Sequence, residues 1–183
     1  MKKTILAVLA ALILVPAGLK AQKTDQAIAK IRKDYAAALE KINTAGGYYE
    51  DVFVNCATVN IQEMWSGSGP HKETTEIFYA MGLDEEWNFD RHIFFVRNKY
   101  NVSVREFYTE ILYDENGKPE FYYHKAFGYD GNALEWRFYW EKGKLIRSLV
   151  PKNINTEAFP DSQPTPEGAY KAAENFISYL TRL

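Results

Sequence analysis

The sequence predicts a single α+β domain, with an N-terminal helix, an antiparallel meander sheet of six to seven strands, and a C-terminal helix. Two observations predict this fold class. Apolar residues repeat at three- and four-residue spacing only near the two ends of the chain. Between them, short aromatic and β-branched runs alternate with turn residues. A lipocalin-like barrel, in which similar strands close on themselves, is the structural alternative.

The N-terminal segment has the pattern of an export signal. Two lysines precede an apolar run over residues 5–15, and Ala21 ends a stretch that offers small side chains near a cleavage point. The apolar run is too short to cross a bilayer, so we expect no stable membrane insertion. The sequence therefore predicts a signal peptide at 1–21, a single domain at 22–183, and a location in the periplasm or outside the cell.

The charge composition of the chain argues against some classes of binding partner. Without the signal peptide and its three lysines, the chain holds 19 basic and 24 acidic residues, a net charge of −5. This mild acidity argues against nucleic acid or an anionic membrane as a general partner. The single cysteine, Cys56, cannot form an intramolecular disulfide, and its apolar neighbours predict a buried, unreactive thiol.

Two segments are expected to be helical. Residues 24–45 carry apolar side chains along one face, a Thr-Asp pair can cap the start, and a Gly-Gly pair ends the segment. A second helix is expected over 166–180, with Thr165 as the N-cap and Pro166 in the first turn.

Seven strand candidates lie between the helices. They cover residues 50–64, 72–80, 91–101, 103–113, 119–127, 133–141 and 144–150. A Ser/Gly loop at 65–72 and an acidic loop at 81–90 interrupt them. Three dipeptides suit two-residue type I′ turns: Asn116-Gly117, Asp130-Gly131 and Lys142-Gly143.

Two-residue turns would fix the register of the last four strands. Leu112 would pair with Phe121, Phe121 with Trp140, and Trp140 with Leu145. Each face would then carry an apolar row beside a row that contains charge, unlike a sheet with one solvated face. We therefore expect both helices to cover one face. The other face would be a shallow concavity, an oligomer interface, or a surface covered by the long loops.

This register places polar residues among aromatic ones. Glu110 and Arg147 would share a row with two aromatic side chains, and His124 and Arg137 would share a row with two hydroxyl side chains. The candidate ligand-binding residues are Tyr122, His124, Arg137, Tyr139, Glu110 and Arg147. The alternative interpretation is an ordinary sheet surface with an ion pair and a hydrogen-bonded histidine.

No motif indicates catalysis, metal or nucleotide binding. The three histidines lie on separate segments without HExxH or paired-cysteine spacing, so we expect no metal and no cofactor. The SGSG string at 66–69 lacks the strand–turn–helix context of a nucleophile elbow. A glycosidase needs two carboxyls at a defined separation across a cleft, and the spacing of the acids selects no such pair. No residue is therefore assigned a catalytic role.

Two strings carry a family resemblance. LYDENGKPEFYY at 112–123 and RFYWEKGKLIRSLV at 137–150, together with a signal that ends in Ala-Gln, resemble uncharacterised exported proteins of Gram-negative gut-type bacteria. The hairpins are similar to those of PepSY-like and β-lactamase-inhibitor-protein-like domains. The resemblance covers mainly 101–150, and it implies a helix on an antiparallel sheet and binding without catalysis. The chain departs from these domains in its long strand region at 50–80, and no functional residue is carried over.

These observations predict a non-catalytic exported binding protein. Its aromatic sheet face would hold a small molecule, a glycan or a protein segment, since large apolar patches on soluble proteins usually mark contacts. One alternative is a glycan-directed hydrolase, which requires two carboxyls facing one cleft, at least one of them with a raised pKa. The other is a structural protein of the envelope that uses the face to form a homodimer. If both faces were buried within the monomer, the binding hypothesis would lose its main basis.

Overall fold

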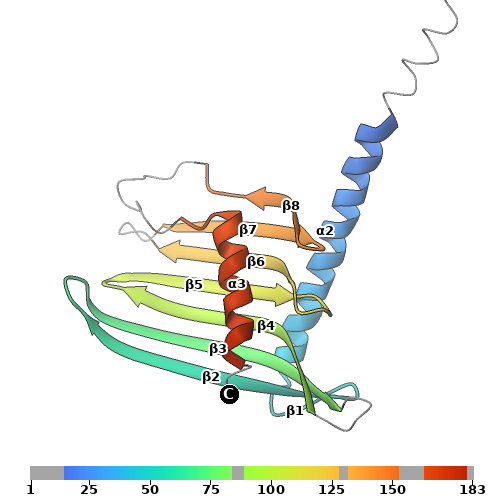
Figure 1. Ribbon diagram of the computed structural model, residues 1–183. Coiled ribbons are helices and arrows are strands. Elements are labelled where there is room, and N and C mark those ends of the chain that lie inside the picture. The colour runs from blue at the N-terminus through green and yellow to red at the C-terminus, as the bar shows by residue number, and fades with distance from the viewer. Residues whose placement is uncertain (1–14, 84–88, 128–131, 153–162, 181–183) are drawn as a thin grey trace, which may run out of the picture.

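The computed structural model is an α+β fold in which an open antiparallel sheet lies between two helices (Figure 1). It describes residues 15–83, 89–127, 132–152 and 163–180. The helices are α2 (Val15–Ile42) and α3 (Pro166–Leu180). The strands are β1 (Gly47–Tyr49), β2 (Val52–Trp65), β3 (Gly69–Leu83), β4 (Phe89–Val102), β5 (Arg105–Tyr113), β6 (Pro119–Phe127), β7 (Ala133–Glu141) and β8 (Lys144–Leu149).

The sheet is an eight-stranded meander in sequence order, β1 to β8. The predicted fold class is confirmed, with one strand more than expected because the short strand β1 pairs with the start of β2. The sheet stays open, and the barrel alternative is not adopted. Each strand pairs with its chain neighbour, so short connections suffice throughout the sheet.

The span of α3 agrees with the prediction, and the span of α2 differs from it. α3 spans the expected residues, and the Thr165 hydroxyl caps it by accepting a hydrogen bond from the Gly168 amide at 3.1 Å. The described part of α2 spans Val15–Ile42, so it includes residues before the expected start at Thr24 and ends three residues before the expected end at 45.

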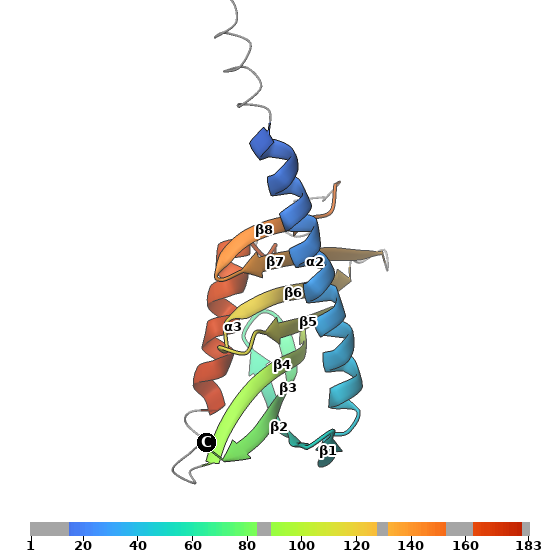
Figure 2. The ribbon, with the colours of Figure 1, turned by 90° about the vertical axis from the view of Figure 1, so that its right-hand side faces the viewer.

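The helices pack on opposite faces of the sheet, so the expectation that both cover one face is wrong. Figure 2 shows the sheet edge-on, with α3 on one side and α2 on the other. Each helix has its own core cluster. Ala169 and Ala173 of α3 pack with Ile111, Tyr122 and other buried residues. On the α2 side, the cluster comprises Ile28, Ile31, Ala38, Ile42, Val54, Phe78, Phe94, Phe95, Leu112, Phe121 and Tyr139.

The first hairpin turn differs from the expected type. Gly117 has a φ of 71°, but Asn116 does not have a positive φ, so a type I′ turn is excluded. The Gly117 amide donates to the Asp114 carbonyl at 2.9 Å, and the Asp114 amide donates to the Lys118 carbonyl at 2.8 Å. This is a three-residue loop with glycine in the left-handed position. An irregularity between Leu112 and Tyr113 then restores the expected pairing of Leu112 with Phe121.

The last two hairpins differ in how well they follow the expected register. At Lys142-Gly143 both residues have positive φ, and Trp140 pairs with Leu145 as predicted. A register shift between Tyr139 and Trp140 then pairs Tyr139 with Arg147 and not with the expected Ile146. Between β6 and β7, Phe121 pairs with Tyr139 and not with Trp140. The connection from Phe127 to Ala133 holds an odd number of residues, which moves β7 by one position. The Asp130-Gly131 turn itself lies outside the described residues.

A slip of one residue turns every side chain of a strand to the opposite face. Trp136 and Phe138 therefore join the core beneath α3, while Tyr139 joins the core beneath α2. The corrected register gives each face of the central strands an apolar cluster of its own. This answers why neither face has the alternation of a solvated sheet.

The loops and the cysteine also differ from expectation. Within the expected loop at 65–72 only residues 66–68 form a turn, because Trp65 already pairs with Gly69 and residues 69–72 belong to β3. Of the acidic loop, 84–88 lies outside the described residues. Cys56 is exposed, because it lies on β2 beyond Val54, the last residue of that strand in the α2 core cluster. Desolvation still raises the pKa of its thiol, which disfavours the reactive thiolate.

The close approach of α3 depends on its small residues, and this can be tested with Ala173→Leu. Ala173 is fully buried, and the Tyr113 hydroxyl donates to its carbonyl oxygen at 2.8 Å. The larger side chain should lower the free energy of unfolding by about 1–3 kcal/mol because the interface has no room for it. Urea unfolding measures the change, and Lys171→Leu on the exposed face of α3 is the control. Equal stability of the two variants would contradict this packing.

Candidate functional site

The corrected register divides the predicted site residues between the two faces. Glu110, Arg137, Tyr139 and Arg147 lie on the α2 side, as their contacts and strand pairing indicate. Tyr122 and His124 lie on the α3 side. The expected register had already placed Glu110 and Arg147 on the face opposite the other four residues. The β7 slip moves Arg137 and Tyr139 to the side of Glu110, so Tyr122 and His124 remain alone on the α3 side.

Glu110 is the centre of a buried polar network on the α2 side. Its carboxylate accepts hydrogen bonds from the hydroxyl groups of Tyr35 on α2 and Tyr108 on β5. The Arg97 guanidinium lies 3.9 Å from Glu110 and 3.3 Å from Glu76. Burial, together with Glu110 as hydrogen-bond acceptor, raises the pKa of both tyrosines, so both remain donors. The network joins α2 to three strands.

The other predicted residues on this face pair with neighbours. Arg137 donates to Glu135, and its guanidinium lies 5.3 Å from the centre of the Tyr123 ring. Arg147 donates to Asp25 of α2 at 2.6 Å. Arg137 and Tyr139 also line a cavity of about 180 Å³ against α2. Arg147 and Tyr139 therefore contact α2, whereas the partners of Arg137 lie within the sheet.

Tyr122 and His124 lie beneath the first turn of α3. His124 is buried, and its Nδ1 lies 2.9 Å from the Thr109 hydroxyl, while its Nε2 has no hydrogen-bond partner among the described residues. Desolvation lowers the pKa of His124 to about 4, so the ring is neutral at neutral pH. Both residues line a hollow of about 310 Å³, which Thr165 and Ala169 border from the helix side.

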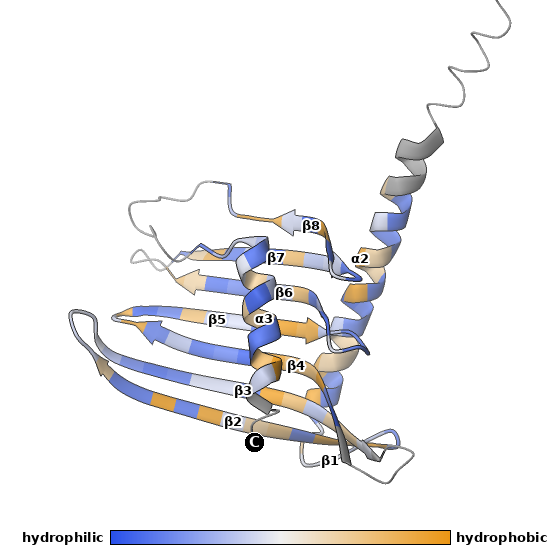
Figure 3. Ribbon diagram, viewed as in Figure 1, coloured by the Kyte–Doolittle hydropathy of each residue, from blue (hydrophilic) through white to orange (hydrophobic). Residues whose placement is uncertain are grey.

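The largest of these cavities is a groove of about 830 Å³ that the sequence interpretation missed. It lies on the part of the α2-side face that α2 does not cover, towards the other ends of β4, β5 and β6. Figure 3 shows that the ends of β4 and β5 away from α2 are largely hydrophilic. We call it the lysine groove, and its defining side chains are Lys72, Lys99, Tyr108, Tyr123, Lys125 and Phe127.

The rim of the lysine groove is held in a strained conformation. Ser103, in the turn between β4 and β5, has a φ of 57°, a backbone conformation that residues other than glycine rarely adopt. The Asn101 amide group donates to the carbonyls of Ser103 and Pro70, each at 2.8 Å. The Asn101 side-chain oxygen also accepts the Lys72 amide at 2.7 Å. One side chain thus ties the turn to β3 and fixes the shape of the rim.

One pairing could have revealed the groove from sequence. Tyr108 pairs with Lys125 in the expected register, and the structure confirms that pair. The contribution of Lys72 and Lys99 depends on β3 and β4, for which the sequence offered no turn from which to derive a register.

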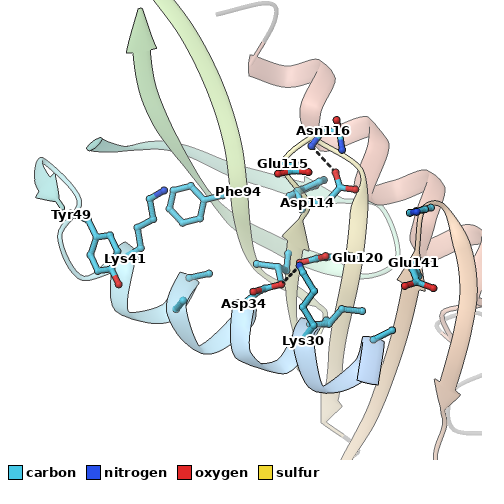
Figure 4. A pocket seen from close by; sticks show the side chains of 17 residues that line it. Lys30, Asp34, Lys41, Tyr49, Phe94, Asp114, Glu115, Asn116, Glu120 and Glu141 are labelled. Atoms are coloured by element: carbon cyan, nitrogen blue, oxygen red, sulfur yellow. Dashed lines mark hydrogen bonds and ion pairs between the residues drawn. The ribbon is translucent and has the colours of Figure 1, made fainter. Parts of the chain in front are cut away.

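A second cavity, of about 580 Å³, lies between α2 and the β5–β6 hairpin (Figure 4). Lys30 and Asp34 of α2 form an ion pair at 2.6 Å, and Glu120 lies beside them. Burial raises the pKa of Glu120 to about 7, and the nearby carboxylates of Asp34 and Asp114 add to this shift. The positive charge of Lys30 opposes the shift. We call this the acidic cavity.

Two further findings limit the chemistry of the described residues. No group of three or more histidine, cysteine, aspartate or glutamate side chains in the described ranges is arranged to hold a metal ion. Neither described helix is long and apolar enough to cross a membrane.

No family model, curated protein or solved structure matches this chain, so its function is argued from its own geometry.

The network at Glu110 can be tested with a double-mutant cycle. Tyr35→Phe should lower the free energy of unfolding by about 1–3 kcal/mol, because a buried carboxylate loses a donor. In a Glu110→Gln background the same change should have a smaller effect. Chemical denaturation measures all four proteins. The control is Tyr139→Phe, since the Tyr139 hydroxyl makes no hydrogen bond to a described residue; equal losses in both backgrounds would contradict the coupling.

The raised pKa of Glu120 predicts a pH dependence of stability. Because its folded-state pKa of about 7 exceeds the ordinary 4.5, the folded protein holds this proton more tightly than the unfolded chain. The stabilising contribution is complete below pH 4.5 and is lost as the pH rises through about 7. Glu120→Gln should therefore gain about 1–2 kcal/mol relative to wild type between about pH 5 and about pH 8, after allowance for partial exposure.

Urea unfolding at several pH values measures this difference, and Glu115→Gln on the same hairpin is the control. His124 acts in the opposite direction, since its lowered pKa removes stability as the pH falls below the ordinary value of 6.5. The difference between wild type and Glu120→Gln cancels that effect. Parallel curves for these two proteins would contradict the raised pKa.

Proposed function

We propose that this chain is a non-catalytic exported binding protein and that the lysine groove holds its ligand. The observation that carries the proposal is a groove of about 830 Å³ on the part of the sheet that α2 leaves uncovered. Pockets of this volume suit a small molecule, a short glycan or a protein segment. The export pattern at residues 1–21 supports a location in the periplasm or outside the cell.

This proposal has a different basis from the sequence hypothesis. That hypothesis needed a whole sheet face left open, and the centres of both faces are covered by helices. The lysine groove is smaller, and it retains the aromatic character that motivated the hypothesis. Tyr108, Tyr123 and Phe127 project from adjacent strands and supply ring surfaces against which a ligand can stack.

Binding without catalysis fits the charges in the groove. Its charged lining in the described structure is three lysines and Glu106, so no two carboxyls face each other across it. Glu106 alone cannot supply the acid and the nucleophile or base that glycoside hydrolysis requires. The network beneath the groove leaves Glu110 with two tyrosine donors and Arg97, which is the arrangement of a structural carboxylate.

A glycan-directed hydrolase is the second candidate, and the acidic cavity favours it. Glu120 has a pKa raised to about 7, as a general acid requires, and Asp34 lies near it on α2. Asp34 is paired with Lys30 at 2.6 Å, which weakens its availability as a nucleophile or base. The lysine groove is therefore the preferred site, and the acidic cavity supplies the competing outcome.

The proposal is tested by nuclear magnetic resonance with a panel of neutral and acidic oligosaccharides and short peptides. We expect shift changes concentrated at groove residues, and a loss of affinity of about tenfold in Phe127→Ala, because ring stacking contributes on this scale. Tyr48→Ala is the control, since Tyr48 is an exposed aromatic residue of β1 outside the groove.

Three outcomes would overturn the proposal. The first is shift changes at Glu120 and Asp34 with new reducing ends, which would indicate the hydrolase. The second is a concentration-dependent dimer in sedimentation experiments that occludes the groove, which would indicate the homodimer. The third is a panel in which no compound perturbs the groove.

A further inference from the structure

The lysine groove has a charge opposite to that of the chain. The whole sequence has a formal net charge of −2, but the groove's charged lining is Lys72, Lys99 and Lys125 against Glu106. None of the three lysines forms an ion pair within the part of the chain that the structure describes. Three unpaired cations give this groove a positive local potential on an acidic protein.

The ammonium groups of Lys99 and Lys125 lie near aromatic rings and form no ion pair with a described carboxylate. The Lys99 Nζ lies 5.7 Å from the centre of the Tyr108 ring, and the Lys125 Nζ lies 4.6 Å from that of Phe127. These contacts are weaker than an ion pair with a charge-assisted hydrogen bond. A ligand anion can therefore attract both cations without displacing a protein carboxylate from either one.

The positive charge is spread across the groove and not focused at one point. Lys72, Lys99 and Lys125 come from β3, β4 and β6, so the outer two are three strand spacings apart. At about 4.8 Å per spacing, their backbone positions lie roughly 14 Å apart across the sheet. A chain with an acidic group on successive units can contact all three lysines without their side chains converging on one anion.

The backbone of the groove floor favours a glycan over a peptide. β5 and β6 are interior strands, each paired on both sides, so an extended peptide cannot add to them as a further strand. Tyr108, Tyr123 and Phe127 offer apolar ring surfaces, against which the C–H faces of sugar rings can pack. Nucleic acid also combines rings with repeated charge, but the acidity of the whole chain opposes a long polyanion.

We propose that the lysine groove binds an acidic oligosaccharide, with Lys72, Lys99 and Lys125 contacting anionic groups on successive sugars and the three aromatic residues packing against the rings. This inference rests on the proposed binding function and names its ligand class. Carboxylated and sulfated sugars share the required chemistry, and the experiment uses one of each.

The test uses pairs of ligands with the same sugar backbone and different negative charge. Trigalacturonate is compared with its methyl ester, and a chondroitin sulfate hexasaccharide with its desulfated form, by calorimetry and by chemical-shift mapping on the full chain. Each acidic probe that binds should exceed its less charged counterpart by about tenfold or more. Its affinity should also fall between about 50 mM and about 500 mM salt, because salt screens exposed charges.

Variants then assign the binding to the groove. Lys99→Gln and Lys125→Gln should each weaken the acidic probe by about tenfold and leave the weaker binding of the uncharged trigalacturonate methyl ester unchanged. Lys33→Gln, on the exposed side of α2, is the matched control and should bind as the wild type does. Equal urea midpoints for all variants show that the fold is intact.

The outcomes separate this inference from the proposed function. If the uncharged methyl ester binds the groove as tightly as trigalacturonate, the acidic class is wrong and the binding function stands. If polyglutamate or a thymidine oligonucleotide perturbs the groove more strongly than either glycan, the ligand is an acidic peptide or a nucleic acid and the glycan class is wrong. If none of these probes perturbs the groove while the acidic cavity responds, both proposals are overturned.

Discussion

The structure depends on one constraint, which is that the central strands are apolar on both faces. Ile111 and Phe138 point to one side, and Leu112 and Phe121 to the other, so neither face can be left to solvent. One helix cannot cover both faces, and the chain places a helix at each end of the meander. α2 and α3 consequently lie on opposite sides of one sheet, as Figure 2 shows. Tyr122, buried beneath α3, is part of this cover and not an exposed binding residue.

The same constraint explains where the binding surface lies. α2 runs past one end of the strands only, so it buries the apolar half of its face and leaves the hydrophilic half open. Glu110 lies at the boundary between these halves. It accepts hydrogen bonds from Tyr35 of the helix and from Tyr108 of the groove, so one buried carboxylate holds the helix and orients a groove wall. The docking of α2 and the shape of the lysine groove are therefore coupled through Glu110.

Three of the four cavities can be distinguished by the chemistry of the side chains that line them. The lysine groove collects cations from β3, β4 and β6. The acidic cavity collects carboxylates because the β5–β6 hairpin turns towards α2, and Asp114 there also accepts two amides of its own loop, at 2.9 and 2.8 Å. The hollow beneath α3 is small and holds a neutral histidine. Of the three, the lysine groove alone combines large volume, ring surfaces and unpaired charge among the described residues.

The sequence by itself determined the fold class, the C-terminal helix with its Thr165 cap, and the order of strands, because periodicity and turn residues are local properties. It also determined the β5–β6 pairing that joins Tyr108 to Lys125. The tertiary structure determined which side chains lie on which face of the sheet. The connection before β7 is one residue out of step with a two-residue turn, and this moved Arg137 and Tyr139 to the side opposite His124. Which face each helix covers, and the groove that α2 leaves open, arise from packing between distant segments, which no local pattern encodes.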